Sequence, residues 1–138
     1  MVHDISPMYN EMLKRIMIQE NDEAILDVLR IALEEEGFQV IPIRQCDDAI
    51  IGEIDTFRPH MVMLDIWLRE QDCLGLSPMI KARYPDLPLI ALSCNINIQK
   101  VYGKEGFDAY IPKPFDLDLL YSVVHQHLPN GSKPIGKA

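Results

Sequence analysis

Short apolar runs alternate with segments of helical apolar period along this chain, and this alternation limits the fold more than any other feature. The run MVML at residues 61–64 is apolar at every position, which is typical of a strand buried on both faces, as in a parallel sheet. Residues 22–36 instead repeat their apolar positions at helical spacing, and Gly37 follows as a helix terminator. The apolar residues of that helical face are Ile25, Val28, Leu29, Ala32 and Leu33.

The same two patterns recur to the end of the chain. The expected strands are residues 15–19, 38–43, 61–64, 88–93 and 109–112, and the expected helices are residues 22–36, 47–56, 73–84, 97–103 and 117–128. Pro42 places the second strand toward an edge of the sheet, since proline cannot donate to a ladder. Asp116 is suited to cap the last helix. Strands that alternate with helices predict a parallel sheet with right-handed crossovers and helices on both faces.

The later helices also have predicted inward faces. They are Ala49, Ile50, Ile54 and Phe57 in the second helix, Leu76, Met79 and Ile80 in the third, and Leu117, Leu120, Val123, Val124 and Leu128 in the last.

Length and charge exclude some classes of protein. A chain of 138 residues is long enough for one domain with a core and too short for two ordinary ones. The formal net charge of −8 and the lack of a Lys/Arg cluster argue against direct nucleic-acid binding. No apolar stretch reaches membrane-spanning length, and the N-terminus lacks the order of a secretory signal. Cys46, Cys73 and Cys94 are predicted to be reduced thiols of a cytoplasmic protein.

The predicted domain covers residues 15–128. Residues 1–14 form an N-terminal extension, for which an extra helical turn and disorder are both left open. Residues 129–138 are polar and contain glycine and proline, so they are predicted to be a flexible tail.

Polar side chains follow four of the five expected strands. Glu20 and Asn21 follow the first, Asp65 ends the third, Ser93 ends the fourth and Lys113 follows the fifth. Ligands of open parallel sheets bind outside the carboxyl ends of the strands. An acid after a strand is often only a helix cap and a serine there only a turn, but the four together predict one site at that edge.

These motifs resemble the receiver domain of two-component response regulators. The matching stretches are QEND after the first strand, VMLDIWL around the third, IALSC at the fourth and YIPKPF at the fifth. The resemblance implies a flavodoxin-like fold with strand order 2-1-3-4-5. It also implies that the domain is a signalling switch that accepts a phosphoryl group. Such a switch is not an enzyme, since it catalyses only its own phosphorylation and dephosphorylation.

The resemblance also implies a role for each site residue. Asp65 would accept a phosphoryl group from a histidine kinase or phosphotransfer protein, and Lys113 would pair with the phosphoryl oxygens. Ser93 would move to hydrogen-bond that group while Tyr110 turns inward. Mg²⁺ would be held by Glu20, Asp65, the backbone carbonyl of Trp67 and, weakly, Asn21. These movements would change the surface of the domain, which would then bind a target protein or an output domain. A homodimer formed through the same surface is also left open.

Some positions depart from the receiver pattern. Asn21 stands where receivers most often have a second aspartate, so the site loses one negative charge and we expect weaker Mg²⁺ binding. Arg69 replaces the usual proline and Cys73 a common glycine in the loop after Asp65. These changes motivate an alternative function, a receiver-like interaction module that works without phosphorylation. A third interpretation is a small nucleotide- or flavin-binding enzyme. The absence of a G-x-G-x-x-G motif or a P-loop after any expected strand argues against it.

Overall fold

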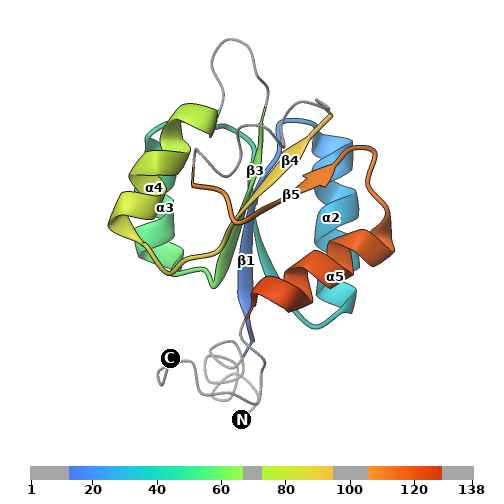
Figure 1. The fold of residues 1–138 in the computed structure, drawn as a ribbon. Coiled ribbons are helices and arrows are strands. Elements are labelled where there is room, and N and C mark those ends of the chain that lie inside the picture. Colours follow the sequence, from blue (N-terminus) through green and yellow to red (C-terminus); the bar gives the residue numbers. More distant parts are fainter. Residues whose placement is uncertain (1–12, 67–72, 95–105, 129–138) are drawn as a thin grey trace.

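The sheet at the centre of the molecule consists of parallel strands and is covered by helices on both faces (Figure 1). A computed structural model describes residues 13–66, 73–94 and 106–128. Within them the strands are β1 (Arg15–Gln19), β2 (Gln39–Ile43), β3 (Met61–Asp65), β4 (Leu89–Ser93) and β5 (Ala109–Pro112). The helices are α2 (Glu23–Glu35), α3 (Ala49–Phe57), the short 3₁₀ helix η1 (Cys73–Leu76), α4 (Ser77–Arg83) and α5 (Leu117–His127).

The strand order is β2-β1-β3-β4-β5, and all four strand pairs are parallel. This confirms the predicted flavodoxin-like fold. Pro42 lies in β2, at an edge of the sheet, and is exposed, as expected for a residue that cannot complete a ladder.

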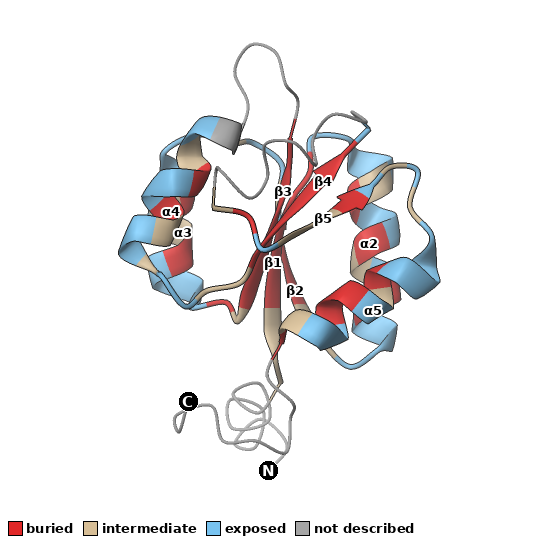
Figure 2. Cartoon of the chain, in the orientation of Figure 1, coloured by how far each residue is buried: buried red, intermediate tan, exposed pale blue. Residues whose placement is uncertain are grey.

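The sheet separates two apolar cores, because successive side chains of a strand point to opposite faces. Ile16 and Ile18 of β1 pack with buried residues of α2 and α5, whereas Met17 packs with buried residues of α3 and α4. Figure 1 shows α2 and α5 on one side of the sheet and α3 and α4 on the other. β3 and β4 are buried at every position (Figure 2), which confirms that MVML is a strand covered on both faces.

Capping residues set the ends of the helices. The Asp22 carboxylate accepts hydrogen bonds from the backbone N–H groups of Ala24 and Ile25, at 2.9 and 3.2 Å, and so begins α2. Gly37 follows the end of α2 with a φ of 95°, a conformation that glycine adopts without strain. Asp116 caps α5 by accepting from the Asp118 N–H at 3.1 Å, as the sequence predicts.

The connection from α3 to β3 is held by Arg15 at the start of β1. Its guanidinium donates to the carbonyl oxygens of Phe57 and Arg58 at 2.8–3.1 Å, where Arg58 has a left-handed φ of 50°. The backbone N–H of Arg15 donates to His60 Nδ1 at 2.9 Å. Burial, together with the Arg15 and Lys14 charges, lowers the pKa of His60 from 6.5 to about 4, so this nitrogen stays an acceptor at neutral pH.

Some predicted inward positions are wrong. Val28 and Met79 are both 51% exposed, and Phe57 and Leu117 are both 42% exposed. Ala49 is exposed as well. Ala49 and Phe57 are the end residues of α3, and Leu117 is the first residue of α5. In α2 the buried residues are Leu26, Leu29, Ala32 and Leu33, a face rotated away from Val28.

The prediction of three reduced thiols is also wrong, because Cys46 is disulfide-bonded. Cys94 has a free thiol and is exposed. Spacing along the sequence could not reveal this bond, since it depends on distances that only the fold sets. The predicted helix at 97–103, most of the N-terminal extension and the C-terminal tail lie outside the described residues.

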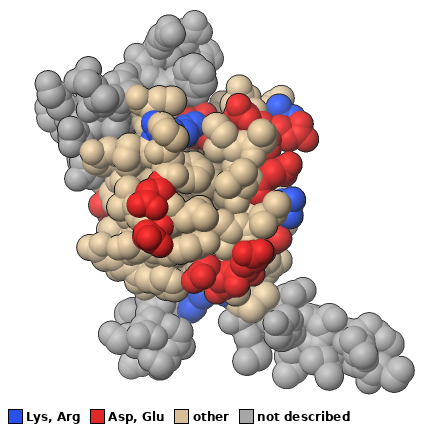
Figure 3. Space-filling model, turned by 90° about the vertical axis from the view of Figure 1, so that its right-hand side faces the viewer, with Lys and Arg blue, Asp and Glu red and all other residues tan. Residues whose placement is uncertain are grey.

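Acidic side chains outnumber basic ones on the face that α2 and α5 cover (Figure 3). The exposed acids of these two helices and their caps are Asp22, Glu23, Asp27, Glu34, Glu35, Glu36, Asp116 and Asp118. Among the described residues, no helix combines the length and the apolar character that crossing a membrane requires.

Candidate functional site

Four polar residues meet at the carboxyl ends of the strands, because parallel strands all end at the same edge of the sheet. Glu20 follows β1, Asp65 ends β3, Ser93 ends β4 and Lys113 follows β5. Glu20 and Ser93 are each 1% exposed, and Asp65 is 3% exposed. Burying polar groups is costly unless they are paired, so their burial together at one edge points to a site.

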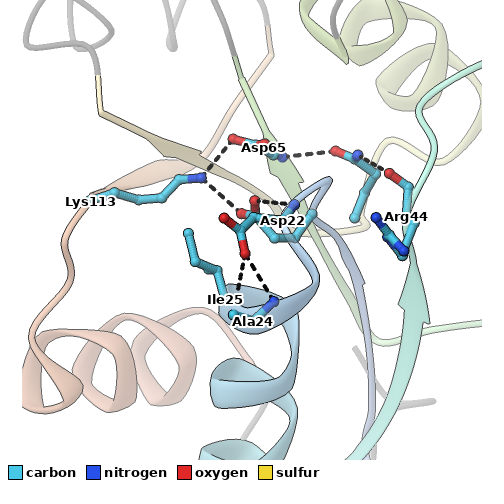
Figure 4. Close-up of polar contacts among 8 residues, drawn as sticks. Asp22, Ala24, Ile25, Arg44, Asp65 and Lys113 are labelled. Carbon is cyan, nitrogen blue, oxygen red and sulfur yellow. Dashed lines mark hydrogen bonds and ion pairs between the residues drawn. The ribbon is translucent and has the colours of Figure 1, made fainter.

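Lys113 joins the two carboxylates of this cluster (Figure 4). Its Nζ lies 2.8 Å from Glu20 Oε1 and 3.0 Å from Asp65 Oδ1. The Lys113 side chain is only 9% exposed. The structure therefore brings together three residues that are up to 93 positions apart in the chain.

Ser93 is held beside this cluster through the backbone. The Lys113 N–H donates to the Ser93 carbonyl oxygen at 2.8 Å, and Ser93 pairs with Pro112 in the register of β4 and β5. The hydroxyl-bearing residue and the ammonium-bearing residue thus lie on adjacent strand ends.

The second oxygen of Glu20 is also engaged. Glu20 Oε2 accepts from the backbone N–H of Asp22 at 3.1 Å, while the Asp22 carboxylate itself caps α2 (Figure 4). Of the three acidic or amide side chains at 20–22, the structure places Glu20 in the site and uses Asp22 to begin a helix. Asn21 between them is exposed, and its backbone carbonyl accepts from Arg44 at 3.2 Å.

Electrostatics at the site reflect burial and close opposite charges. Burial raises the pKa of Glu20, and the Asp65 charge adds to this, against the hydrogen bonds from Lys113 and Asp22. Burial would lower the pKa of Lys113, but its hydrogen bonds to Glu20 and Asp65, with their charges, outweigh it and raise that pKa. Lys113 is therefore a firmly held cation.

The donor set of the site suits a small hard cation. Glu20 and Asp65 bring two negative charges and Lys113 one positive charge, which leaves a formal charge of −1. Mg²⁺ prefers carboxylate and carbonyl oxygens and often uses only one or two protein carboxylates. These two buried carboxylates fit that requirement, although Lys113 already neutralises part of their charge.

The other predicted site residues are placed less centrally or lie outside the description. Tyr110 of β5 is half-buried and packs against the core on the α3 and α4 side. Trp67 and Arg69 lie outside the described residues, so the predicted carbonyl ligand has no described position.

Gln19 is a site neighbour that sequence reasoning missed. It is the last residue of β1, is 3% exposed, and its amide contacts the backbone of Asp65. The only signal in the sequence is a polar residue directly after the apolar RIMI, and such a residue usually marks no more than a strand end.

Known proteins share the sequence pattern and the fold of this chain. The family model of the response regulator receiver domain matches residues 16–125. The chain is 32% identical over 117 residues to the nitrogen assimilation regulatory protein NtrX of Azorhizobium caulinodans, which covers 82% of this chain and 26% of that protein. The chain thus spans about a quarter of that relative's length.

Solved structures show the same architecture. The receiver domain of NtrX from Brucella abortus superposes with a TM-score of 0.73 at 30% identity, covering 82% of this chain and 97% of that one. A CheY-like receiver domain protein from Methanospirillum hungatei gives a TM-score of 0.72 at 27% identity, covering 83% of this chain and 94% of that one.

Proposed function

The chain belongs to the response regulator receiver domain family, and on this premise we propose that Asp65 accepts a phosphoryl group from a phosphohistidine. The donor would be a sensor histidine kinase or a phosphotransfer protein of a two-component phosphorelay. The observation that supports this most directly is the buried Lys113 ammonium, 3.0 Å from Asp65 Oδ1 and 2.8 Å from Glu20 Oε1.

In the transfer, an Asp65 oxygen attacks phosphorus as the P–N bond to the donor imidazole breaks. The imidazole leaves with the bonding electron pair. Catalysis of such a step depends on positioning and on cations that balance the phosphoryl oxygens. Lys113 is suited to this because its point charge is fixed among carboxylates and would turn to the phosphoryl oxygens when they arrive.

Mg²⁺ is the proposed cofactor, with Glu20 and Asp65 as its described ligands. When bound, it would supply further positive charge against the phosphoryl oxygens. Asn21 is a weak ligand in this proposal, since an amide oxygen carries no charge. The Trp67 carbonyl, implied by the family resemblance, completes the proposed set.

The proposed output is a change of surface. Ser93 would shift to hydrogen-bond the phosphoryl group, and Tyr110 would turn inward on the adjacent strand. Their positions support this, because Tyr110 of β5 is in register with Ala91 of β4, two residues before Ser93 and on the same face of that strand. A switch of this kind needs two arrangements that one new charged group can bias.

The proposed partners are the phosphodonor and either a target protein or an output domain, in the cytoplasm. We propose that the domain is not an enzyme in its own right and catalyses only its own phosphorylation and dephosphorylation. The NtrX protein that this domain resembles is named as a nitrogen assimilation regulatory protein. For this domain, no direct nucleic-acid contact is proposed.

The exposed, uncharged Asn21 favours a second candidate, an interaction module that works without phosphorylation. Retention of a buried Glu20–Lys113–Asp65 cluster weighs against it. Buried charges cost free energy to desolvate, so a domain freed from phosphoryl chemistry would gain by losing them.

Incubation with acetyl phosphate and Mg²⁺, followed by intact-mass measurement, separates the two. We expect the wild type to gain the mass of one phosphoryl group and Asp65→Asn to gain none. Asp86→Asn is the matched control, because Asp86 is exposed and precedes the amino-terminal end of β4, whereas the site lies at the carboxyl ends of the strands. A wild type that stays unmodified at saturating Mg²⁺ would contradict the phosphoacceptor function and favour the interaction module.

A further inference from the structure

A buried primary amide lies directly behind the phosphoacceptor. Gln19 ends β1, and strand alternation places its side chain on the same face as Met17, toward α3 and α4. Only 3% of the residue is exposed. An amide buried this deeply needs partners for its N–H and C=O groups, so where those groups bind says what the residue does.

The two ends of the amide bind two different strand ends. Gln19 Oε1 accepts from the backbone N–H of Asp65 at 3.1 Å, and this hydrogen bond is buried. Gln19 Nε2 donates to the backbone carbonyl of Arg44, just after β2, at 3.0 Å. Figure 4 shows this chain of contacts running from Asp65 to the Arg44 segment. One planar group therefore ties together the ends of β1, β2 and β3.

The contact with Asp65 extends the ladder past its last backbone pair. The register of β1 and β3 ends with Gln19 opposite Leu64, one residue before Asp65. On its other side Asp65 is in register with Leu92 of β4. The Gln19 amide therefore restrains the backbone of Asp65 from the β1 side. A restrained backbone fixes the direction of the Asp65 Cα–Cβ bond, and the carboxylate that this bond carries lies 3.0 Å from Lys113 Nζ.

Arg44 in turn contacts the acidic loop, residues 20–23, which follows β1. The Arg44 guanidinium donates to the Asn21 carbonyl at 3.2 Å and lies 3.6 Å from a Glu23 oxygen. The Arg44–Glu23 pair is exposed and contributes little free energy by itself. Its geometric effect is to hold the residues after Glu20 against the same segment that Gln19 holds to Asp65.

We propose that Gln19 is a positioning residue of the phosphoacceptor site, which sets the aim of Asp65 through its backbone and links it to the acidic loop through Arg44. This rests on the proposed phosphoacceptor function. A merely structural Gln19 would affect stability alone, whereas a positioning Gln19 affects the rate of phosphorylation and the hydrogen exchange of the Asp65 amide.

The test compares Gln19→Met, Gln19→Glu and Met17→Leu with the wild type. Methionine keeps the length of glutamine and loses both hydrogen bonds. Ionised glutamate keeps an acceptor for the Asp65 N–H, loses the donor to Arg44 and adds a negative charge. Met17→Leu is the control, since Met17 is fully buried on the same strand and packs in the same core. Each protein is examined for its rate of phosphorylation by acetyl phosphate, its melting temperature and its amide hydrogen exchange.

For Gln19→Met we expect phosphorylation about tenfold slower and exchange of the Asp65 amide at least about tenfold faster, because small losses of alignment are costly in group transfer. Gln19→Glu should keep the Asp65 amide protected, because its carboxylate still accepts from the Asp65 N–H. Met17→Leu should match the wild type in both readouts.

Equal phosphorylation rates in Gln19→Met and Met17→Leu would overturn the inference, as would loss of Asp65 protection in Gln19→Glu. If Gln19→Met does not fold, the Gln19→Glu protection decides alone. If neither the wild type nor Met17→Leu takes up a phosphoryl group, the proposed function fails and the positioning role falls with it. Phosphorylation of those two proteins with no effect at Gln19 rejects the positioning role only.

Discussion

Replacing Lys113 by methionine should destabilise the fold in a way that depends strongly on pH. The change keeps most of the side-chain volume and removes the charge that lies between two carboxylates, which are 1% and 3% exposed. Breaking a buried ion pair by removing one partner typically costs about 3–5 kcal/mol. In this site the remaining carboxylates can limit the cost, because one of them can take up a proton.

That proton sets the magnitude. Holding a proton at pH 7 on a carboxyl whose ordinary pKa is 4.5 costs about 1.36 kcal/mol per pH unit, or about 3.4 kcal/mol over 2.5 units. At pH 5 the same step costs about 0.7 kcal/mol. The folded variant then binds a proton that the unfolded chain does not, so its stability falls as pH rises from 5 to 7. We therefore expect Lys113→Met to lose about 3 kcal/mol at pH 7 and less than about 1 kcal/mol at pH 5.

Urea denaturation followed by circular dichroism at several pH values measures this directly. Arg30→Met is the matched control, since Arg30 also lies between two acids, Asp27 at 3.5 Å and Glu34 at 3.3 Å, but on an exposed helix surface. Its loss should stay below about 1 kcal/mol at each pH. A Lys113→Met variant that loses under about 1 kcal/mol at pH 7, or that shows the same pH dependence as the control, would refute the picture of two buried carboxylates held by one cation.

Three further predictions concern single residues. Asn21→Asp adds a negative charge and should lower the Mg²⁺ dissociation constant about tenfold, about 1.4 kcal/mol, as read from Trp67 fluorescence; an unchanged constant would contradict the charge argument. His60 has a pKa lowered from 6.5 to about 4, so the folded state resists protonation and loses stability as pH falls through this window. Discounted for the partial exposure of His60, this loss of stability is about 1–2 kcal/mol. His60→Asn keeps an acceptor for the Arg15 N–H and should remove that part of the pH dependence. If urea titrations gave the same pH profile for the variant and the wild type, the proposed role of His60 would be wrong. Asp22→Ala removes the cap of α2 and should cost about 1 kcal/mol in urea denaturation, whereas a change at exposed Asp86 should cost under about 0.5 kcal/mol; equal effects would mean that the cap contributes nothing.

The fold was predictable because its signals are local and agree with one another. MVML is apolar at each position and is buried on both faces, and Pro42 lies on an edge strand, where proline is tolerated. Helix faces were less predictable. Apolar residues at helical spacing show that a helix has an apolar side, but they do not show which residues at the margin of that side face the sheet. Val28 was assigned to the inner face of α2, whereas Leu26, two residues earlier, is buried there.

The core of the site was predictable for a topological reason. Parallel strands bring their carboxyl ends to one edge, so Glu20, Asp65 and Lys113 could be expected to meet. Contacts made by side chains across that edge could not be foreseen. The bridge from Gln19 to Asp65 and Arg44 depends on how far each strand extends, and the disulfide bond of Cys46 depends on a distance that no spacing in the sequence specifies.

The two cores on either side of the sheet leave β3 no freedom to change its length. Its side chains enter the two cores by turns, Met61 and Met63 toward α2 and α5 and Val62 and Leu64 toward α3 and α4. Deleting one residue there would send every later side chain of the strand to the other face and draw the Asp65 carboxyl back by about 3.3 Å, the rise of one strand residue. The connections around β3 can therefore change in length, whereas an insertion or deletion within the strand would disrupt both cores and the site together.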